Sequence, residues 1–198
     1  MKLGTGHSDK PRETVEAGNH PGRLVWCIDI GTHLVPWEGE SRPVHQIFIG
    51  FELYTDPMMK DGRPFMISRK YTDSLAPKSN LRAMLSNWGG KWFEESLAAP
   101  GKFNLKDYLG KPAMVTVTHY VGKDGNTYAK IGSVAPVPKS LLSTVTPQIN
   151  ATIWLDLDGS ENIKDTVDAI PNFLKDMVKS SPEWEALNSH QLDEDLPF

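Results

Sequence analysis

The chain has 198 residues, of which 39% are hydrophobic and 23% charged, and its formal net charge at pH 7 is −4. This composition is typical of a globular protein and excludes a disordered or collagen-like chain. No apolar run approaches the roughly 20 residues of a transmembrane helix, and residues 1–18 lack the apolar core of a signal peptide. We therefore expect one domain with appendages, located in the cytoplasm and without a membrane partner.

The charge is unevenly distributed along the chain. Residues 1–59 hold five Lys/Arg against eight Asp/Glu (−3), residues 60–150 hold thirteen against six (+7), and residues 151–198 hold three against eleven (−8). A basic middle followed by an acidic end is typical of a polyanion-binding body with a separate acidic tail. The single cysteine, Cys27, excludes an internal disulfide, and its apolar surroundings indicate a buried thiol.

The first half of the chain predicts an arm followed by three strands. Residues 1–22 lack hydrophobic periodicity and predict a flexible arm. Residues 23–35 predict a long strand that bends at Gly31, and residues 44–55 and 65–72 predict the next two strands. In the second strand, apolar residues alternate between two faces, as in a sheet that is buried on one side.

A helix and two more strands follow. Residues 79–88 have apolar side chains at helical spacing, with Ser79 as the N-cap and glycines directly after the segment to end it. Residues 113–121 and 127–137 predict two strands joined by a tight turn of the Asp-Gly type.

Five strands with a helix between the third and fourth follow the element order of an OB-fold barrel. We therefore expect a mainly β protein with an OB-fold domain at residues 23–139. A small sandwich, or an SH3-like barrel with an insertion, gives a similar list of elements and remains an alternative.

The last part of the chain predicts mainly helices. Residues 149–158 predict another strand, and the following residues predict helices interrupted at Pro171 and Pro182. Their apolar stripe must pack either on the barrel or on a second subunit, which makes a homodimer possible. Residues 140–188 are thus interpreted as a strand and helical extension, and residues 189–198 as an acidic tail for protein interaction.

Sequence motifs for catalysis are missing. The chain has no GxxxxGK, GxGxxG, GxSxG or HExxH motif, and its six histidines are scattered singly. Residues 156–162 resemble the start of a calcium loop, but Val167 stands where such a loop needs its closing glutamate. We expect no catalytic residue, no metal site and no cofactor.

Basic residues instead alternate with aromatic ones, a pattern typical of single-strand binding, in which lysines and arginines track phosphates and rings stack on bases. Trp37, in a polar loop, is the strongest aromatic candidate, and a core position is the alternative for Trp88. The candidate residues are Trp37, Phe48, Arg69, Lys70, Tyr71, Lys78, Arg82, Trp88, Lys91, Tyr120, Lys123, Tyr128 and Lys130.

The ending "DEDLPF" resembles the C-terminal tip of bacterial single-stranded DNA-binding proteins. Stretches such as "VWCIDIGTH", "RKYTDSLAPKSNLRAMLSNWGGKWF" and "AMVTVTHYVGKDGNTYAKIGSVAPVPK" resemble presumed single-stranded DNA-binding proteins of bacteriophages, over about residues 22–139. The bacterial proteins usually join body and tip by a long linker rich in Gly, Gln and Pro, whereas a helical segment runs almost to the tip here.

The resemblance implies an OB-fold that binds single-stranded DNA without sequence preference during replication, recombination or repair, in the host cytoplasm if the protein is phage-encoded. It also implies that the tip recruits replication or recombination proteins through Asp193, Glu194, Asp195, Leu196, Pro197 and Phe198. Two other hypotheses stay open from the residues: an accessory subunit or nuclease that uses the barrel to hold substrate, and a protein-interaction module whose acidic segment mimics DNA.

Overall fold

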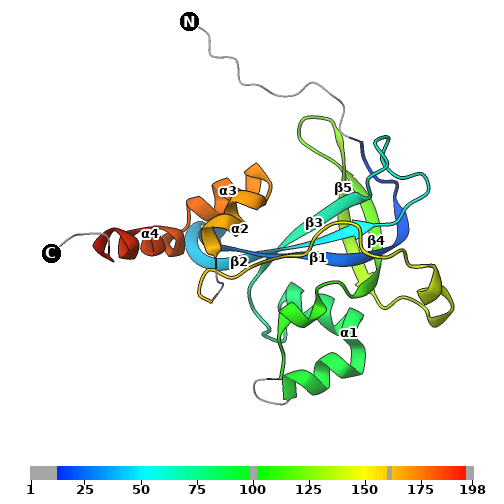
Figure 1. The fold of residues 1–198 in the computed structure, drawn as a ribbon, viewed down its shortest axis with the longest axis horizontal. Coiled ribbons are helices and arrows are strands. Elements are labelled where there is room, and N and C mark those ends of the chain that lie inside the picture. The colour runs from blue at the N-terminus through cyan, green and yellow to red at the C-terminus, as the bar shows by residue number, and fades with distance from the viewer. Residues whose placement is uncertain (1–12, 99–101, 160–161, 195–198) are drawn as a thin grey trace, which may run out of the picture.

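The computed structural model describes residues 13–98, 102–159 and 162–194 (Figure 1). The strands are β1 (Gly18–Trp37), β2 (Glu40–Leu53), β3 (Phe65–Thr72), β4 (Pro112–Val121), β5 (Thr127–Ala135) and β6 (Ile153–Leu155). The helices are α1 (Asn80–Ala98), α2 (Ile163–Ala169), α3 (Asn172–Lys179) and α4 (Pro182–Glu194), with 3₁₀ turns η1 (Leu105–Tyr108) and η2 (Lys139–Thr144). No described helix is long and apolar enough to cross a membrane.

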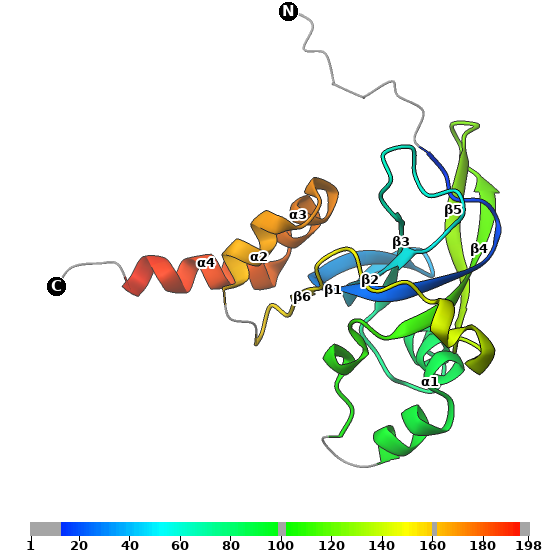
Figure 2. The same cartoon turned by 45° about the vertical axis from the view of Figure 1, so that its right-hand side comes forward.

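The strands form one sheet in the order β3-β2-β1-β4-β5, with every neighbouring pair antiparallel, and β6 adds to β1 in parallel. The sheet curls so that β3 lies beside β5 (Figures 1 and 2), but no backbone ladder joins these two strands. Arg69 reaches across this seam instead, and its Nη1 donates to the carbonyl of Ile131 at 3.4 Å. In place of the expected mainly β protein with a five-stranded barrel, the structure is a mixed α/β fold with a six-stranded sheet that does not close into a barrel.

The inner face of the curled sheet carries the main core. In β2, Ile47, Ile49, Phe51 and Leu53 all point into it, which confirms the predicted alternation. Below the sheet, α1 adds the buried side chains Leu81, Met84, Leu85, Trp88 and Phe93. Burial of each such large side chain contributes roughly 1.5–3 kcal/mol, so this packing accounts for the position of α1.

Helix α1 begins as the sequence predicts. The Ser79 hydroxyl accepts the N–H of Arg82 at 3.1 Å, an N-cap contact that confirms the predicted start. The glycines end the first helical segment, as the sequence predicts, and the chain kinks there. Gly90 has φ 54° and ψ −138°, and a second helical segment continues to Ala98.

Strand β1 serves two cores because its pairing with β2 contains two bulges, between Leu24 and Trp26 and between Asp29 and Gly31. Leu24 and Cys27 face the main core, whereas Ile28 faces a second core on the opposite side of the sheet. The predicted buried thiol is confirmed, and burial raises the pKa of Cys27 to about 12.

The second core joins the outer face of β1 to the C-terminal helices. Leu155 and Leu157 of the β6 segment contribute to it, together with Val167, Ile170, Leu174 and Val178 of the helical region. Interruptions at Pro171 and Pro182 separate α2, α3 and α4, as the sequence predicts. The apolar stripe thus packs on the sheet of its own chain.

A glycine allows α4 to approach β1. Gly31 has φ +77°, and a Cβ built on it would lie 2.4 Å from Cβ of Ser181. Ser181 is fully buried, and its hydroxyl accepts the N–H of Trp184 at 3.2 Å as the N-cap of α4. The start of α4 therefore packs against β1 at Gly31, where the sequence predicts a bend.

Candidate nucleic-acid interface

The β4–β5 hairpin carries an exposed pair of aromatic rings. Tyr120 and Tyr128 are directly opposite each other, with ring centroids 5.6 Å apart and planes 29° from parallel. Their side chains are 47% and 38% exposed, because both point away from the core. Lys130 lies beside them, with Nζ 5.5 Å from the centroid of Tyr120. The hairpin therefore offers flat aromatic surface next to a positive charge.

The turn of this hairpin orients the tyrosines. Asp124 accepts the N–H of Asn126 at 3.1 Å and the hydroxyl of Tyr128. The hydrogen bond from Tyr128 lowers the pKa of Asp124, and the same bond raises the pKa of Tyr128. Gly125 supplies the left-handed conformation of the turn, with φ +79°. Lys123 is exposed in the same turn.

The outer face of β2 and β3 is a second surface with an aromatic ring and a lysine. Phe48 of β2 and Lys70 of β3 are a cross-strand pair, and both point away from the main core. Phe48 is half-buried because α3 covers part of it, with the Phe173 ring edge-on at 6.0 Å between centroids. Lys70 is exposed.

These two surfaces meet at the seam between β3 and β5. Arg69 and Ile131 approach each other there from the inner side. Lys70 and Lys130 are their neighbours in sequence, and alternation places both on the outer side, where both are exposed. No salt bridge within the described parts of the chain engages Lys70, Lys123 or Lys130. Their charges are thus available to an anionic ligand.

Trp37 lies apart from this surface. It is the last residue of β1 rather than a loop residue, and it sits at the tip of the β1–β2 hairpin. Its side chain is half-exposed, and Cζ of Arg42 covers one ring face at 4.0 Å from the centroid. The tip points towards the C-terminal helices, whereas the β4–β5 hairpin extends from the other end of the sheet (Figure 1).

Two of the candidate rings belong to the core, which corrects the prediction that they stack on bases. Tyr71 is buried on the inner face of β3, with Cζ of Arg69 5.2 Å from its centroid. Trp88 is buried under the sheet, and its Nε1 donates to the carbonyl of Pro112 at 3.0 Å. Neither offers a free ring face to a ligand.

The candidates near α1 are not brought to the outer surface of the sheet. Arg82 forms an ion pair with Glu94 at 3.2 Å, and Lys91 one with Glu95 at 3.5 Å. Lys78 is exposed in the loop before the helix. Helix α1 lies on the opposite side of the molecule from the tip of the β4–β5 hairpin (Figures 1 and 2). The exposed candidates are therefore divided among the outer face of the sheet, the tip of the β1–β2 hairpin and the region of α1.

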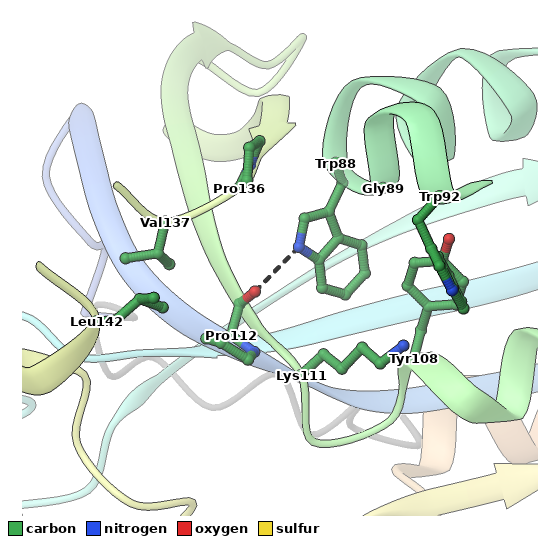
Figure 3. A pocket seen from close by; sticks show the side chains of 9 residues that line it. All are labelled: Trp88, Gly89, Trp92, Tyr108, Lys111, Pro112, Pro136, Val137 and Leu142. Carbon is green, nitrogen blue, oxygen red and sulfur yellow. Dashed lines mark hydrogen bonds between the residues drawn. The ribbon is translucent and has the colours of Figure 1, made fainter. Parts of the chain in front are cut away.

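A shallow pocket of about 230 Å³ opens beside α1. Trp92 and Tyr108 form one wall, and the Lys111 side chain runs along them, with Nζ 4.1 Å and 4.8 Å from their centroids (Figure 3). Trp92 is 47% exposed. Lys111 thus already places a cation against both rings of this pocket.

The acidic tail lies partly outside the described residues. Asp193 and Glu194 are the last residues of α4, so the helix continues into the segment interpreted as a tail. Asp195, Leu196, Pro197 and Phe198 are outside the described ranges. In residues 13–98, 102–159 and 162–194, no group of three or more His, Cys, Asp or Glu side chains is placed to hold a metal ion.

Phe173 and Trp92 are exposed aromatics that the sequence-based candidates do not include. For Phe173, the apolar stripe of residues 163–178 gives no sign of which member stays in solvent. Neither known protein-family models nor curated proteins gave a match to this sequence.

Proposed function

We propose that this protein binds single-stranded DNA without sequence preference and protects it during replication, recombination or repair. The observation that carries the proposal is the exposed Tyr120–Tyr128 pair with Lys130 beside it. Rings stack on bases of any sequence, and each stack contributes about 1–3 kcal/mol, while lysines contact phosphates. Binding by this surface is stoichiometric and needs no catalytic residue.

We also propose that the open, curled sheet is an incompletely closed variant of the OB-fold. The strand order and the proximity of β3 to β5 support this, as does the position of α1 between β3 and β4. OB-folds are partly open five-stranded barrels that bind oligonucleotides on the face of their second and third strands and on the loop between the fourth and fifth. Phe48 and Lys70 occupy that face here, and Lys123 occupies that loop.

The acidic overall charge is compatible with this function because the charge is segregated. Residues 60–150 carry a net charge of +7 and residues 151–198 one of −8. The basic part contains β3, β4 and β5. Contacts between lysines and phosphates release counterions, so affinity should fall steeply as salt increases.

The C-terminal residues are proposed to recruit replication or recombination proteins. Asp193, Glu194 and Asp195 precede Leu-Pro-Phe, a combination that suits a partner pocket with an apolar floor and a basic rim. The clustered acids also steer the segment towards basic partners.

A fluorescence-anisotropy titration tests the main proposal, with a labelled oligo-dT, the same oligonucleotide as a duplex, and the full chain at several salt concentrations. Replacing both Tyr120 and Tyr128 by alanine should weaken binding by at least tenfold. Replacement of Trp92, which is equally exposed but lies on α1, serves as the control and should leave affinity unchanged. Equal affinity for duplex and single strand, or affinity independent of salt, would contradict the proposal.

A further inference from the structure

A ring from the C-terminal helices extends the proposed binding surface beyond Tyr120, Tyr128 and Phe48. Phe173 is the second residue of α3 and directly precedes Leu174, which is fully buried in the second core. The Phe173 ring is 45% exposed, although complete burial of a Phe side chain would contribute roughly 1.5–3 kcal/mol. Single exposed apolar residues are common, whereas contiguous ones mark binding surfaces, and the Phe173 ring is contiguous with that of Phe48.

The position of Phe173 is fixed by its neighbours. Its ring meets Phe48 edge-on, with centroids 6.0 Å apart and planes at 76°. Phe48 is paired across the sheet with Lys70. The order on the surface is therefore a ring from α3, a ring from β2 and a lysine from β3, so that Phe48 lies between Phe173 and Lys70.

The charge of α3 is compatible with an anionic ligand. Although residues 151–198 carry a net charge of −8, helices α2 and α3 together hold three lysines and three aspartates, and so have no net charge. The excess of acids lies elsewhere, mainly around Asp156 and in α4 with the residues after it. The segment that carries Phe173 is thus electrically balanced, and it does not repel phosphates as the whole C-terminal region would.

We infer that Phe173 and Phe48 form a base-stacking subsite, with Lys70 as its phosphate contact, so that α3 is part of the nucleic-acid interface. This inference rests on the proposed function. It assigns the C-terminal helical region a role in ligand binding in addition to packing on the sheet. A single strand would then extend from the Tyr120–Tyr128 pair across the β3–β5 seam, over Lys70, to α3.

Four full-length variants test the subsite by anisotropy with labelled oligo-dT at low salt. Phe173→Ala should bind about tenfold more weakly, as expected for one lost stack. Phe173→Leu keeps an apolar side chain on Phe48 but has no ring, so it should bind as weakly as the alanine variant. Phe173→Tyr keeps the ring and should bind within twofold of wild type. Trp92→Ala, with a ring that is 47% exposed on α1, is the matched control and should also bind within twofold.

A second measurement locates the contact directly. An oligonucleotide that contains 5-bromodeoxyuridine is irradiated on the protein, and the cross-linked peptides are identified by mass spectrometry. Cross-links should fall in α3 or around Phe48, and those in α3 should disappear with Phe173→Ala. Circular dichroism verifies that each variant is folded.

The outcomes are separable. Normal binding by Phe173→Leu, or an absence of cross-links in α3 together with normal binding by Phe173→Ala, overturns the subsite. If the Tyr120 and Tyr128 replacements still weaken binding in that case, the proposed function stands without the subsite. A wild-type chain that binds no oligonucleotide overturns both.

Discussion

Glu183 of α4 accepts two hydrogen bonds from Thr32 of β1, from the backbone N–H at 2.9 Å and from the hydroxyl at 2.6 Å. His45 of β2 lies between this carboxylate and a second one. Its Nδ1 is 3.4 Å from Glu183, and its Nε2 is 2.8 Å from Asp29. This polar cluster fastens the last helix to the strands beside Gly31.

Glu183→Gln should therefore destabilise the fold. The carboxylate accepts both hydrogen bonds from Thr32 with a negative charge, whereas the neutral amide has only one acceptor oxygen. Hydrogen bonds to a charged group contribute about 1.5–3 kcal/mol. We expect the free energy of unfolding at pH 7, from urea titration, to fall by about 1–2 kcal/mol. Glu185→Gln on the exposed side of α4 is the control and should change it by less than about 0.5 kcal/mol. Equal stability of both variants would contradict this role of Glu183.

The stabilisation by Glu183 should depend on pH. Burial tends to raise the pKa of Glu183, but the hydrogen bonds from Thr32 outweigh it and lower the pKa to about 2, from an ordinary value of 4.5. A carboxyl with a lowered pKa stabilises the fold above its unfolded pKa and loses this effect as the pH falls towards its folded pKa. The stability difference between wild type and Glu183→Gln should thus be largest above pH 4.5 and shrink towards pH 2.

Asp29 has the opposite dependence. Burial raises its pKa, against the hydrogen bond from Gly31 and the charge of His45. Its contribution therefore favours the folded state at low pH and is lost as the pH rises through its folded pKa. Urea titrations of wild type and Glu183→Gln over the same pH values cancel this effect, since both proteins contain Asp29. A stability difference that is constant with pH would refute the assignment to Glu183.

Glu52→Gln should weaken the attachment of the segment before β6. Glu52 is fully buried and accepts the Tyr54 hydroxyl at 2.6 Å and the backbone N–H groups of Ile149 and Asn150 at 2.9 Å and 2.8 Å. An amide leaves part of these buried donors unpaired, at a cost of about 1–3 kcal/mol in the free energy of unfolding. Glu40→Gln, exposed on the same strand, is expected to be neutral in the same urea titration.

Lys130 and Lys70 should each contribute to the salt dependence of binding. For single strands, the slope of log K against log salt falls by about 0.7 for each phosphate contact that is lost. Anisotropy titrations with oligo-dT at several salt concentrations should give this decrease for Lys130→Ala and for Lys70→Ala. Lys164→Ala, an exposed lysine on α2, should leave the slope unchanged. A smaller salt slope for Lys164→Ala, with unchanged slopes for Lys70→Ala and Lys130→Ala, would place the ligand away from the β3–β5 seam.

Removal of residues 193–198 should leave oligonucleotide affinity equal or higher, because the three acids in this segment compete with DNA for basic groups. The same truncation should abolish capture of a purified replication or recombination protein that binds the full chain. Weaker binding of oligo-dT by the truncated protein would contradict the competition. Calorimetric titration at fixed salt measures both effects.

Local signals in the sequence predict much of the fold. The pattern of residues 65–72 gives the bounds of β3, and Pro171 and Pro182 mark the breaks between the last helices. These features depend on near neighbours, such as a missing N–H group or alternation along one strand. The open seam was not predictable in this way, because it lies between β3 and β5, which are distant in sequence and meet only through tertiary packing.

The candidate site was predictable only in part for the same reason. Tyr120 and Tyr128 are exposed because they lie on the outer face near the end of a hairpin, which alternation indicates. Tyr71 also lies near a strand end, but it shares a face with Phe65 and Ile67, so the alternation along β3 places it inward. Phe173 meets Phe48 edge-on and stays 45% exposed, which depends on how α3 packs on the sheet and not on a local pattern.

The shared strand β1 has a consequence for how the molecule unfolds. Cys27 and Ile28 are neighbours in the chain, yet they belong to different hydrophobic cores, and β6 pairs with β1 at this same place. The C-terminal helices cannot detach as a separate unit without exposing Ile28 and removing hydrogen-bond partners from β1. The sheet and the helices should therefore open together, as a single cooperative unit in hydrogen exchange.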